Sequence, residues 1–80
     1  MSVKSTVKQI LSEYPIDMFP ISGAYIIDSV KSRMSIGNRK PFDGTIMRKL
    51  RELRYDGYII ECIDKHRSLY RIRRKNGNIA

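Results

Sequence analysis

The sequence predicts a small α+β domain in which three helices precede a two-stranded β-hairpin. Apolar residues recur at helical spacing in three segments, and these segments occupy most of the chain up to Gly57. Two runs rich in β-branched and aromatic residues, 58–63 and 69–73, then follow with a short polar segment between them. We assign residues 1–75 to one domain and residues 76–80 to a flexible C-terminal tail.

The length and the cysteine content limit the class of protein. A chain of 80 residues buries only about two thirds of its unfolded surface, so one apolar core must stabilise it. The single cysteine, Cys62, excludes an intramolecular disulfide and a Cys/His metal pattern, and we expect it to be a small apolar filler in a strand. With no apolar run long enough for a membrane span or a secretory signal, we expect a cytoplasmic protein.

The net charge of +8 is unevenly distributed along the chain. Residues 31–54 contain eight Lys and Arg against two acids, and residues 65–80 contain six bases and no acid. Residues 1–30 and 55–64 are acidic overall. Two basic blocks favour a polyanionic partner, either nucleic acid or an acidic membrane surface. We exclude the membrane, because neither basic block combines a basic helix with an additional exposed apolar face.

The first predicted helix begins after Ser2, a suitable N-cap residue, and is limited by Pro15, because the residue before proline avoids the helical region. Five apolar residues lie on one of its faces: Val3, Val7, Ile10, Leu11 and Tyr14. Residues 16–21 follow as a connector or a brief edge strand, since Pro20 does not suit a central strand. We expect Phe19 or Ile21 to reach the core.

The second predicted helix begins at the N-cap Ser22, with Ile21 and Ile26 placed as a hydrophobic staple. Gly37 is expected to end it in the left-handed conformation. Its buried face comprises Ile26, Ile27, Val30 and Met34. A basic loop, residues 35–42, leads to the next helix.

The third predicted helix spans residues 43–56, with Asp43 as its N-cap and Gly57 after its end. Its inward face consists of Ile46, Leu50 and Leu53. Arg48 and Arg51 then point away from the core, while Thr45 and Lys49 lie on the flanks. The two strands follow, and their turn, residues 64–68, carries Lys65, His66 and Arg67 at its tip.

This order of elements resembles the winged helix-turn-helix superfamily. The most specific segment is Gly44–Ile59, GTIMRKLRELRYDGYI. It is similar to the recognition helix and following strand of PadR-like and related winged-helix regulators, which have a Gly-Thr-apolar start, an Arg-rich amphipathic middle and a Gly-apolar-Ile close. Those regulators usually add a long dimerisation helix or a ligand domain, to which no segment of this sequence corresponds.

The resemblance implies a small transcriptional regulator that binds double-stranded DNA, with helix 43–56 in the major groove and the turn 64–68 as a wing. The residues it assigns to DNA are Arg39, Lys40, Thr45, Arg48, Lys49, Arg51, Lys65, His66, Arg67, Arg73, Arg74 and Lys75. A stand-alone chain of this size and charge would suit a viral or plasmid-encoded regulator. A homodimer through the first helix is a further hypothesis, because DNA half-sites usually come in pairs.

Two alternatives keep the fold and change the partner. The basic surface would suit structured RNA or a nucleoprotein, or it would bind acidic proteins if the domain is an adaptor. Single-strand binding by base stacking on tyrosines is a weaker reading, because Tyr58 and Tyr70 are expected to pack in the core and Tyr25 and Tyr55 to be half-buried at helix ends. We find no catalytic constellation and expect no enzyme, cofactor or metal.

Overall fold

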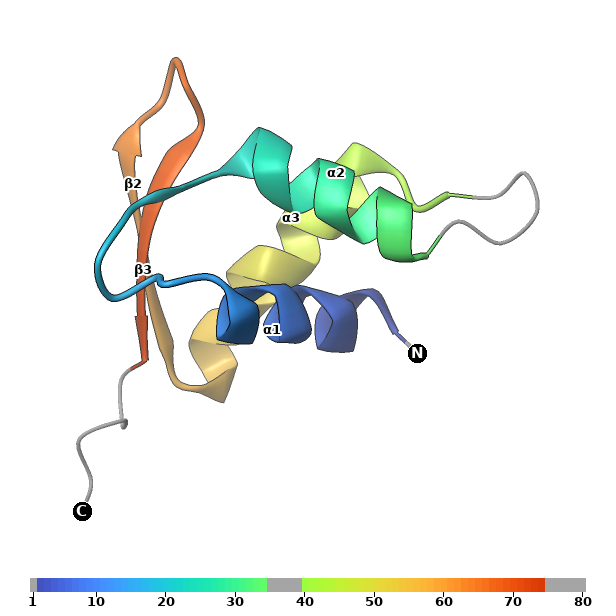
Figure 1. Cartoon of the computed structure of the whole chain (residues 1–80), viewed down its shortest axis with the longest axis horizontal. Helices are drawn as coiled ribbons and strands as arrows, with labels where there is room; N and C mark the ends of the chain where they lie inside the picture. The colour runs from blue at the N-terminus through green and yellow to red at the C-terminus, as the bar shows by residue number, and fades with distance from the viewer. Residues whose placement is uncertain (1, 35–39, 75–80) are drawn as a thin grey trace.

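The computed structural model describes residues 2–34 and 40–74. Its elements are α1 (Val3–Glu13), β1 (Ile21–Ser22), α2 (Gly23–Arg33), α3 (Asp43–Glu52), the 3₁₀ turn η1 (Leu53–Asp56), β2 (Tyr58–Asp64) and β3 (Leu69–Arg74). Figure 1 shows the three helices gathered on one side of the sheet, which stands at one end of the molecule. The α+β class with three helices is confirmed.

The sheet has three antiparallel strands in the order β1-β3-β2, whereas the sequence predicts a two-stranded hairpin. The extra strand comes from the connector, where Ile21 pairs with Tyr70 and Ser22 with Leu69. The edge-strand alternative for this connector therefore holds only at Ile21, because residues 16–20 lie outside the strand. By pairing there, β1 covers part of an edge of β3 that would otherwise expose unpaired main-chain groups.

The first two helices begin where the sequence predicts. The hydroxyl of Ser2 accepts from the N–H of Ser5 at 3.1 Å, and the hydroxyl of Ser22 accepts from the N–H of Tyr25 at 3.0 Å. These bonds satisfy N–H groups that have no partner within the helix. α2 ends at Arg33 with Met34 as its C-cap, so it stops earlier than predicted, and Gly37 lies outside the described residues.

The third helix differs from the prediction at both ends. Phe42 occupies the N-cap position, and Asp43 is the first helical residue; its carboxylate forms an ion pair with Lys31 instead of capping the helix. The α-helix ends at Glu52, and the chain continues as the tighter 3₁₀ turn η1. The prediction of one helix over residues 43–56 is therefore wrong. Gly57 does end the segment in the left-handed region, at φ 99°.

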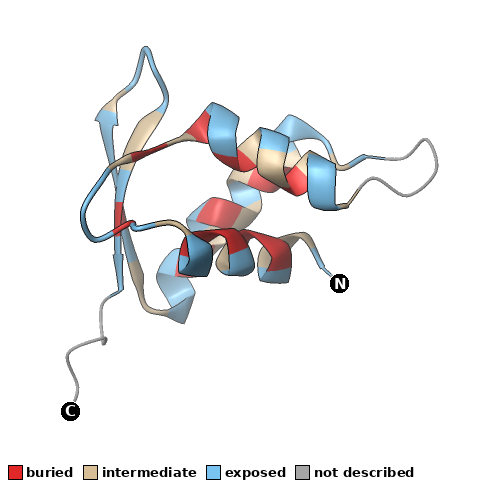
Figure 2. Cartoon of the chain, viewed as in Figure 1, coloured by how far each residue is buried: buried red, intermediate tan, exposed pale blue. Residues whose placement is uncertain are grey.

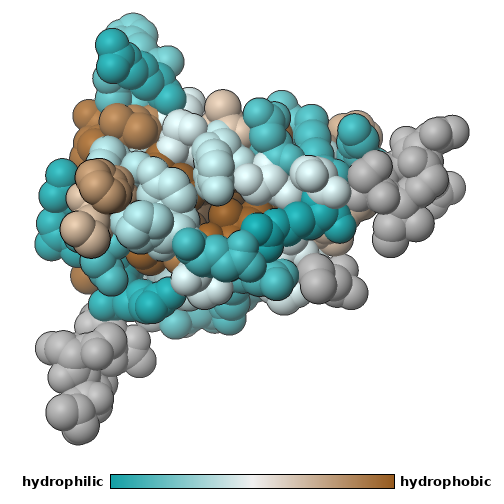
Figure 3. All heavy atoms as spheres, viewed as in Figure 1, coloured by the Kyte–Doolittle hydropathy of each residue, from teal (hydrophilic) through white to brown (hydrophobic). Residues whose placement is uncertain are grey.

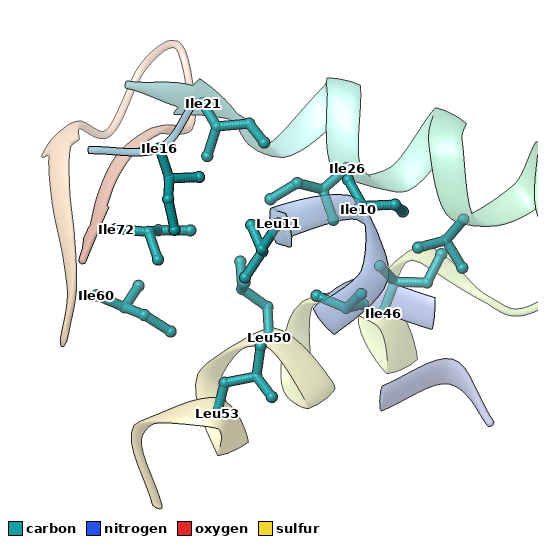
Figure 4. Packing of buried hydrophobic residues seen from close by; sticks show 12 residues of the cluster. Ile10, Leu11, Ile16, Ile21, Ile26, Ile46, Leu50, Leu53, Ile60 and Ile72 are labelled. Carbon is teal, nitrogen blue, oxygen red and sulfur yellow. The ribbon is translucent and has the colours of Figure 1, made fainter. Parts of the chain in front are cut away.

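The core lies between the three helices and the inner face of the sheet, as Figures 2 and 4 show. Its buried apolar residues are Val7, Ile10, Leu11, Ile16, Ile21, Ile26, Val30, Ile46, Leu50, Leu53, Ile60 and Ile72. The connector contributes Ile16 and Ile21, whereas Phe19 is 55% exposed. Tyr58 and Tyr70 pack against this core as predicted, but Tyr55 is 90% exposed instead of half-buried.

Side-chain alternation gives the sheet two distinct faces. Ile60 and Ile72 oppose each other across β2 and β3 and point to the helices, on what we call the inner face. Cys62 follows two residues after Ile60 on β2, yet it is exposed, so its prediction as an apolar filler is wrong. It lies nearer the β2–β3 turn than the core residues of the strand do. Burial therefore ends before the strand ends.

Candidate nucleic-acid interface

The outward side of α3 is fixed by the burial of its inward side. Ile46, Leu50 and Leu53 are fully buried, which holds the helix against α1 and α2 (Figure 4). Arg48 and Arg51 are consequently exposed, as predicted. Helical residues three apart lie on neighbouring parts of one face, so the two guanidinium groups share one side of the helix.

Arg54 connects the end of the third helical segment to the sheet. Its Nη2 donates to the main-chain carbonyl of Ile60 at 3.0 Å. The bond joins η1 to strand β2 and places a guanidinium group beside the inner face of the sheet. Sequence reasoning missed Arg54 as a site residue, although its spacing of three from Arg51 is a signal that could have found it.

The turn between β2 and β3 has a defined local structure. Asp64 Oδ1 accepts from the N–H groups of His66 and Arg67, at 3.0 and 3.2 Å. Ser68 N–H donates to the Lys65 carbonyl at 3.3 Å, and Ser68 has a left-handed φ of 49°. Asp64 thus acts as a turn-forming residue. The side chains of Lys65, His66 and Arg67 are exposed at the tip, as predicted.

Two adjoining grooves lie between α3 and the turn. One, of about 410 Å³, is lined by residues of the α2 N-terminus, α3 and the turn, and the other, of about 280 Å³, by α3, η1 and the inner face of β2 and β3. Met47, Arg51 and Tyr70 line both grooves. Arg51 therefore occupies the centre of one concave surface, which we call the saddle.

Basic side chains from three elements meet in the saddle. Arg51 comes from α3, Arg54 from η1, and Lys65, His66 and Arg67 from the turn. Between them lie apolar side chains, namely Ile27, Met47, Ile60, Cys62 and Tyr70. The fold therefore brings together the two basic blocks that are separated by an acidic segment in the sequence. Such a surface, with cations around a partly apolar floor, suits an anionic ligand that has flat or apolar parts.

On α1 and α2, carboxylates form ion pairs with the basic side chains. Lys4 and Lys8 contact Asp56 Oδ2 at 3.1 and 2.9 Å. Both lysines donate hydrogen bonds that lower the pKa of Asp56, and the effect of Lys8 is the larger. Arg33 donates to Glu13, and this hydrogen bond lowers the pKa of the Glu13 carboxyl group. These pairs neutralise much of the positive charge on α1 and α2.

The basic side chains of the saddle and of the outward side of α3 form fewer ion pairs than those of α1 and α2. Within residues 2–34 and 40–74, the side chains of Arg48, Arg51, Arg54 and Lys65 form no ion pair. Arg67 has only a distant contact, 3.9 Å from its Nε to Asp64 Oδ2. Lys49 contacts Glu52 at 3.4 Å, and both it and Thr45 are partly buried on the flank of α3.

The remaining predicted site residues that the structure describes lie apart from the saddle. Lys40 is exposed before α3, while Arg39 and Lys75 are outside the described residues. Arg73 and Arg74 belong to strand β3, which extends one residue beyond the predicted run 69–73. Arg73 lines a small pocket beside Met18 and Phe19 instead of the saddle.

The described part of the chain gives no indication of metal binding. In residues 2–34 and 40–74, no group of three or more His, Cys, Asp or Glu side chains could hold a metal ion. No helix in the same ranges has the length and apolar character needed to cross a membrane.

No protein-family model, curated protein or solved structure matches the chain.

Proposed function

We propose that the chain binds double-stranded DNA and acts as a small transcriptional regulator of the winged-helix type. In this proposal α3 enters the major groove, and the β2–β3 turn serves as a wing that contacts neighbouring phosphates. The observation that carries it is the saddle, where Arg51, Arg54 and Lys65 converge without carboxylate partners among the described residues. An unpaired cationic surface, in a protein whose basic side chains on α1 and α2 form ion pairs with carboxylates, favours an external polyanion.

The exposed side of α3 favours duplex DNA over duplex RNA. The major groove of B-DNA is about 12 Å wide and admits an α-helix, whereas the major groove of A-form RNA is deep and too narrow for side chains to read. Arg48 and Arg51 project from the outward side of α3, where a guanidinium group can donate two hydrogen bonds to guanine or bind a phosphate. The resemblance of residues 44–59 to PadR-like regulators supports the same choice.

The arginines would contact different parts of the DNA, depending on their surroundings in the protein. Arg54 is held by the Ile60 carbonyl, so its remaining N–H groups are positioned for a phosphate beside the saddle. Arg48 has no such bond among the described residues and can adapt to a base edge. Lys65 and Arg67 at the turn would bind backbone phosphates.

Fluorescence anisotropy titrations test the proposal. Labelled duplex DNA, an RNA hairpin and single-stranded DNA are each titrated at two salt concentrations. We expect duplex DNA to bind most tightly and its affinity to fall steeply with salt, because each neutralised phosphate releases counterions. Absence of duplex binding at low salt, or tighter binding of the RNA hairpin, would refute the proposal; the RNA result would instead support the nucleoprotein alternative.

A pair of variants separates the saddle from general charge. Arg51→Ala is expected to weaken duplex binding and to reduce the slope of log affinity against log salt by about 1. Arg33→Ala removes the same charge from the far end of α2, where Arg33 is paired with Glu13. Equal losses in the two variants would show that binding depends on net charge alone. Circular dichroism melts of both variants exclude unfolding as the cause.

A further inference from the structure

The outer face of the sheet, which points away from the helices, carries exposed apolar residues. Ile59 opposes Arg73 across β2 and β3 and is 40% exposed. Beside β3, the loop between α1 and β1 exposes Met18 and Phe19, which line a pocket together with Arg71 and Arg73. Figure 3 shows hydrophobic side chains at the left edge of the molecule, where the sheet and this loop lie. Exposed apolar surface of this kind often marks an interaction site.

Four charged residues surround these apolar side chains. Arg71 and Arg73 provide the positive charges, and Glu61 and Asp17 the negative ones. Glu61 is directly opposite Arg71 in the register, and Asp17 lines the same pocket as both arginines. Yet none of the four forms an ion pair within the described residues. The face therefore combines apolar contacts with equal numbers of unpaired acids and bases.

We propose that this outer face binds the outer face of a second copy of the chain. A two-fold interface presents the same patch twice, so a patch must complement itself. This face meets that requirement, because each copy supplies both arginines and both carboxylates around apolar residues. An acidic partner would leave Asp17 and Glu61 facing like charges, and a basic partner would do the same to Arg71 and Arg73. A second copy is the occupant that satisfies both signs.

The other candidate surface for a dimer is less suitable. The exposed residues of α1 are polar, namely Ser5, Gln9, Ser12 and Glu13, so the first helix offers no apolar patch for self-association. The outer face also leaves the saddle free, because the saddle uses Ile60, Cys62 and Tyr70 on the inner side of the sheet and at the turn. Self-association and ligand binding would therefore use different surfaces, and the dimer does not rest on the proposed function.

Sedimentation velocity over a range of protein concentrations, without nucleic acid, tests this interface. We expect the mass to rise from 9.4 kDa towards twice that value. Phe19→Ser should raise the dimer dissociation constant at least about tenfold, as for the loss of a central aromatic contact. Phe42→Ser is the matched control, because Phe42 is also highly exposed but lies at the start of α3. A mass of 9.4 kDa at every concentration, or equal effects of both variants, would overturn the proposal.

Charge reversal provides a second test that does not depend on an apolar residue. Glu61→Arg makes the face positive, and Arg71→Glu makes it negative, so each variant alone should repel its own copies. An equimolar mixture should associate again, because the two altered faces are now complementary. Circular dichroism melts confirm that each variant is folded. Failure of the mixture to associate, with both variants folded, would also overturn the proposal.

Discussion

The main-chain N–H of Gly23 donates to the carbonyl of Ser68 at 2.7 Å, so the first residue of α2 holds the β2–β3 turn. A Cβ atom at position 23 would lie 3.3 Å from Ser68 Cβ and 3.4 Å from the Ser68 carbonyl oxygen. A side chain at position 23 would therefore require Ser68 to move by a few tenths of an ångström. The hydrogen bond from Gly23 also joins α2 to the turn that carries Lys65, His66 and Arg67.

Gly23→Val should therefore destabilise the protein and displace the turn. Branched carbon atoms at position 23 would have to push Ser68 away, and overpacking of this kind costs about 1–3 kcal/mol in the free energy of unfolding. Urea denaturation measures the loss. Gly44→Val is the matched control, because a Cβ at Gly44 meets no atom within 4 Å and that residue is exposed in the first turn of α3. An equal loss in both variants would contradict this explanation.

Much of the helical part of the fold is predictable from local sequence. The apolar spacing locates all three helices, and Ser2 and Ser22 cap the first two as expected, because capping and burial patterns depend on nearby residues. The strand β1 is not predictable in this way. Two residues are too few for an alternation pattern, and their pairing with β3 depends on a segment almost fifty residues later.

The candidate site shows the same division between local and tertiary information. The exposure of Arg48 and Arg51 follows from helical periodicity alone. The position of Arg54 depends on its bond to Ile60, and the exposure of Cys62 depends on where the helices stop covering the sheet. Neither relationship can be read from a sequence pattern. The sequence also cannot show which bases pair with carboxylates, and those pairs distinguish the saddle from α1 and α2.

The contacts of Asp56 with Lys4 and Lys8 predict a pH dependence of stability. The pKa of Asp56 is lowered in the folded protein from its ordinary value of 3.8, so the folded state binds this proton less readily than the unfolded state. Ionised Asp56 therefore adds to the free energy of unfolding in full above about pH 3.8, its ordinary pKa. This contribution is lost as the pH falls through the lower pKa of the folded state. In Asp56→Asn, the free energy of unfolding should fall less steeply over this pH range. Urea denaturation between pH 7 and pH 2 measures it.

The control for this prediction is Asp28→Asn. Asp28 is exposed on α2 and forms no ion pair among the described residues, so its replacement should keep the wild-type acid dependence. High salt should weaken the Asp56 effect, because screening reduces the attraction between exposed charges. If Asp56→Asn and wild type lose stability in parallel below pH 4, the lysine contacts do not stabilise the fold.

Arg48→Ala distinguishes base recognition from phosphate binding in the proposed DNA complex. If Arg48 bonds to a base edge, the variant should lose about 1–3 kcal/mol of binding free energy on the preferred site and little on an unrelated sequence. Selection from a random duplex library identifies the preferred site, and titrations with that site and a scrambled duplex measure both losses. Equal losses on the two duplexes would show that Arg48 contacts phosphate only.

The exposure of Cys62 provides a probe of the saddle that requires no mutation. Because its thiol is exposed beside Arg51, Arg54 and Lys65, the folded protein should react with a small alkylating reagent without denaturant. Saturating duplex DNA should slow the reaction by covering the groove that Cys62 lines. Mass spectrometry measures the alkylation rate with and without DNA, and free cysteine in the same mixtures controls for effects on the reagent. An unchanged rate under conditions where anisotropy confirms binding would place the DNA on another surface.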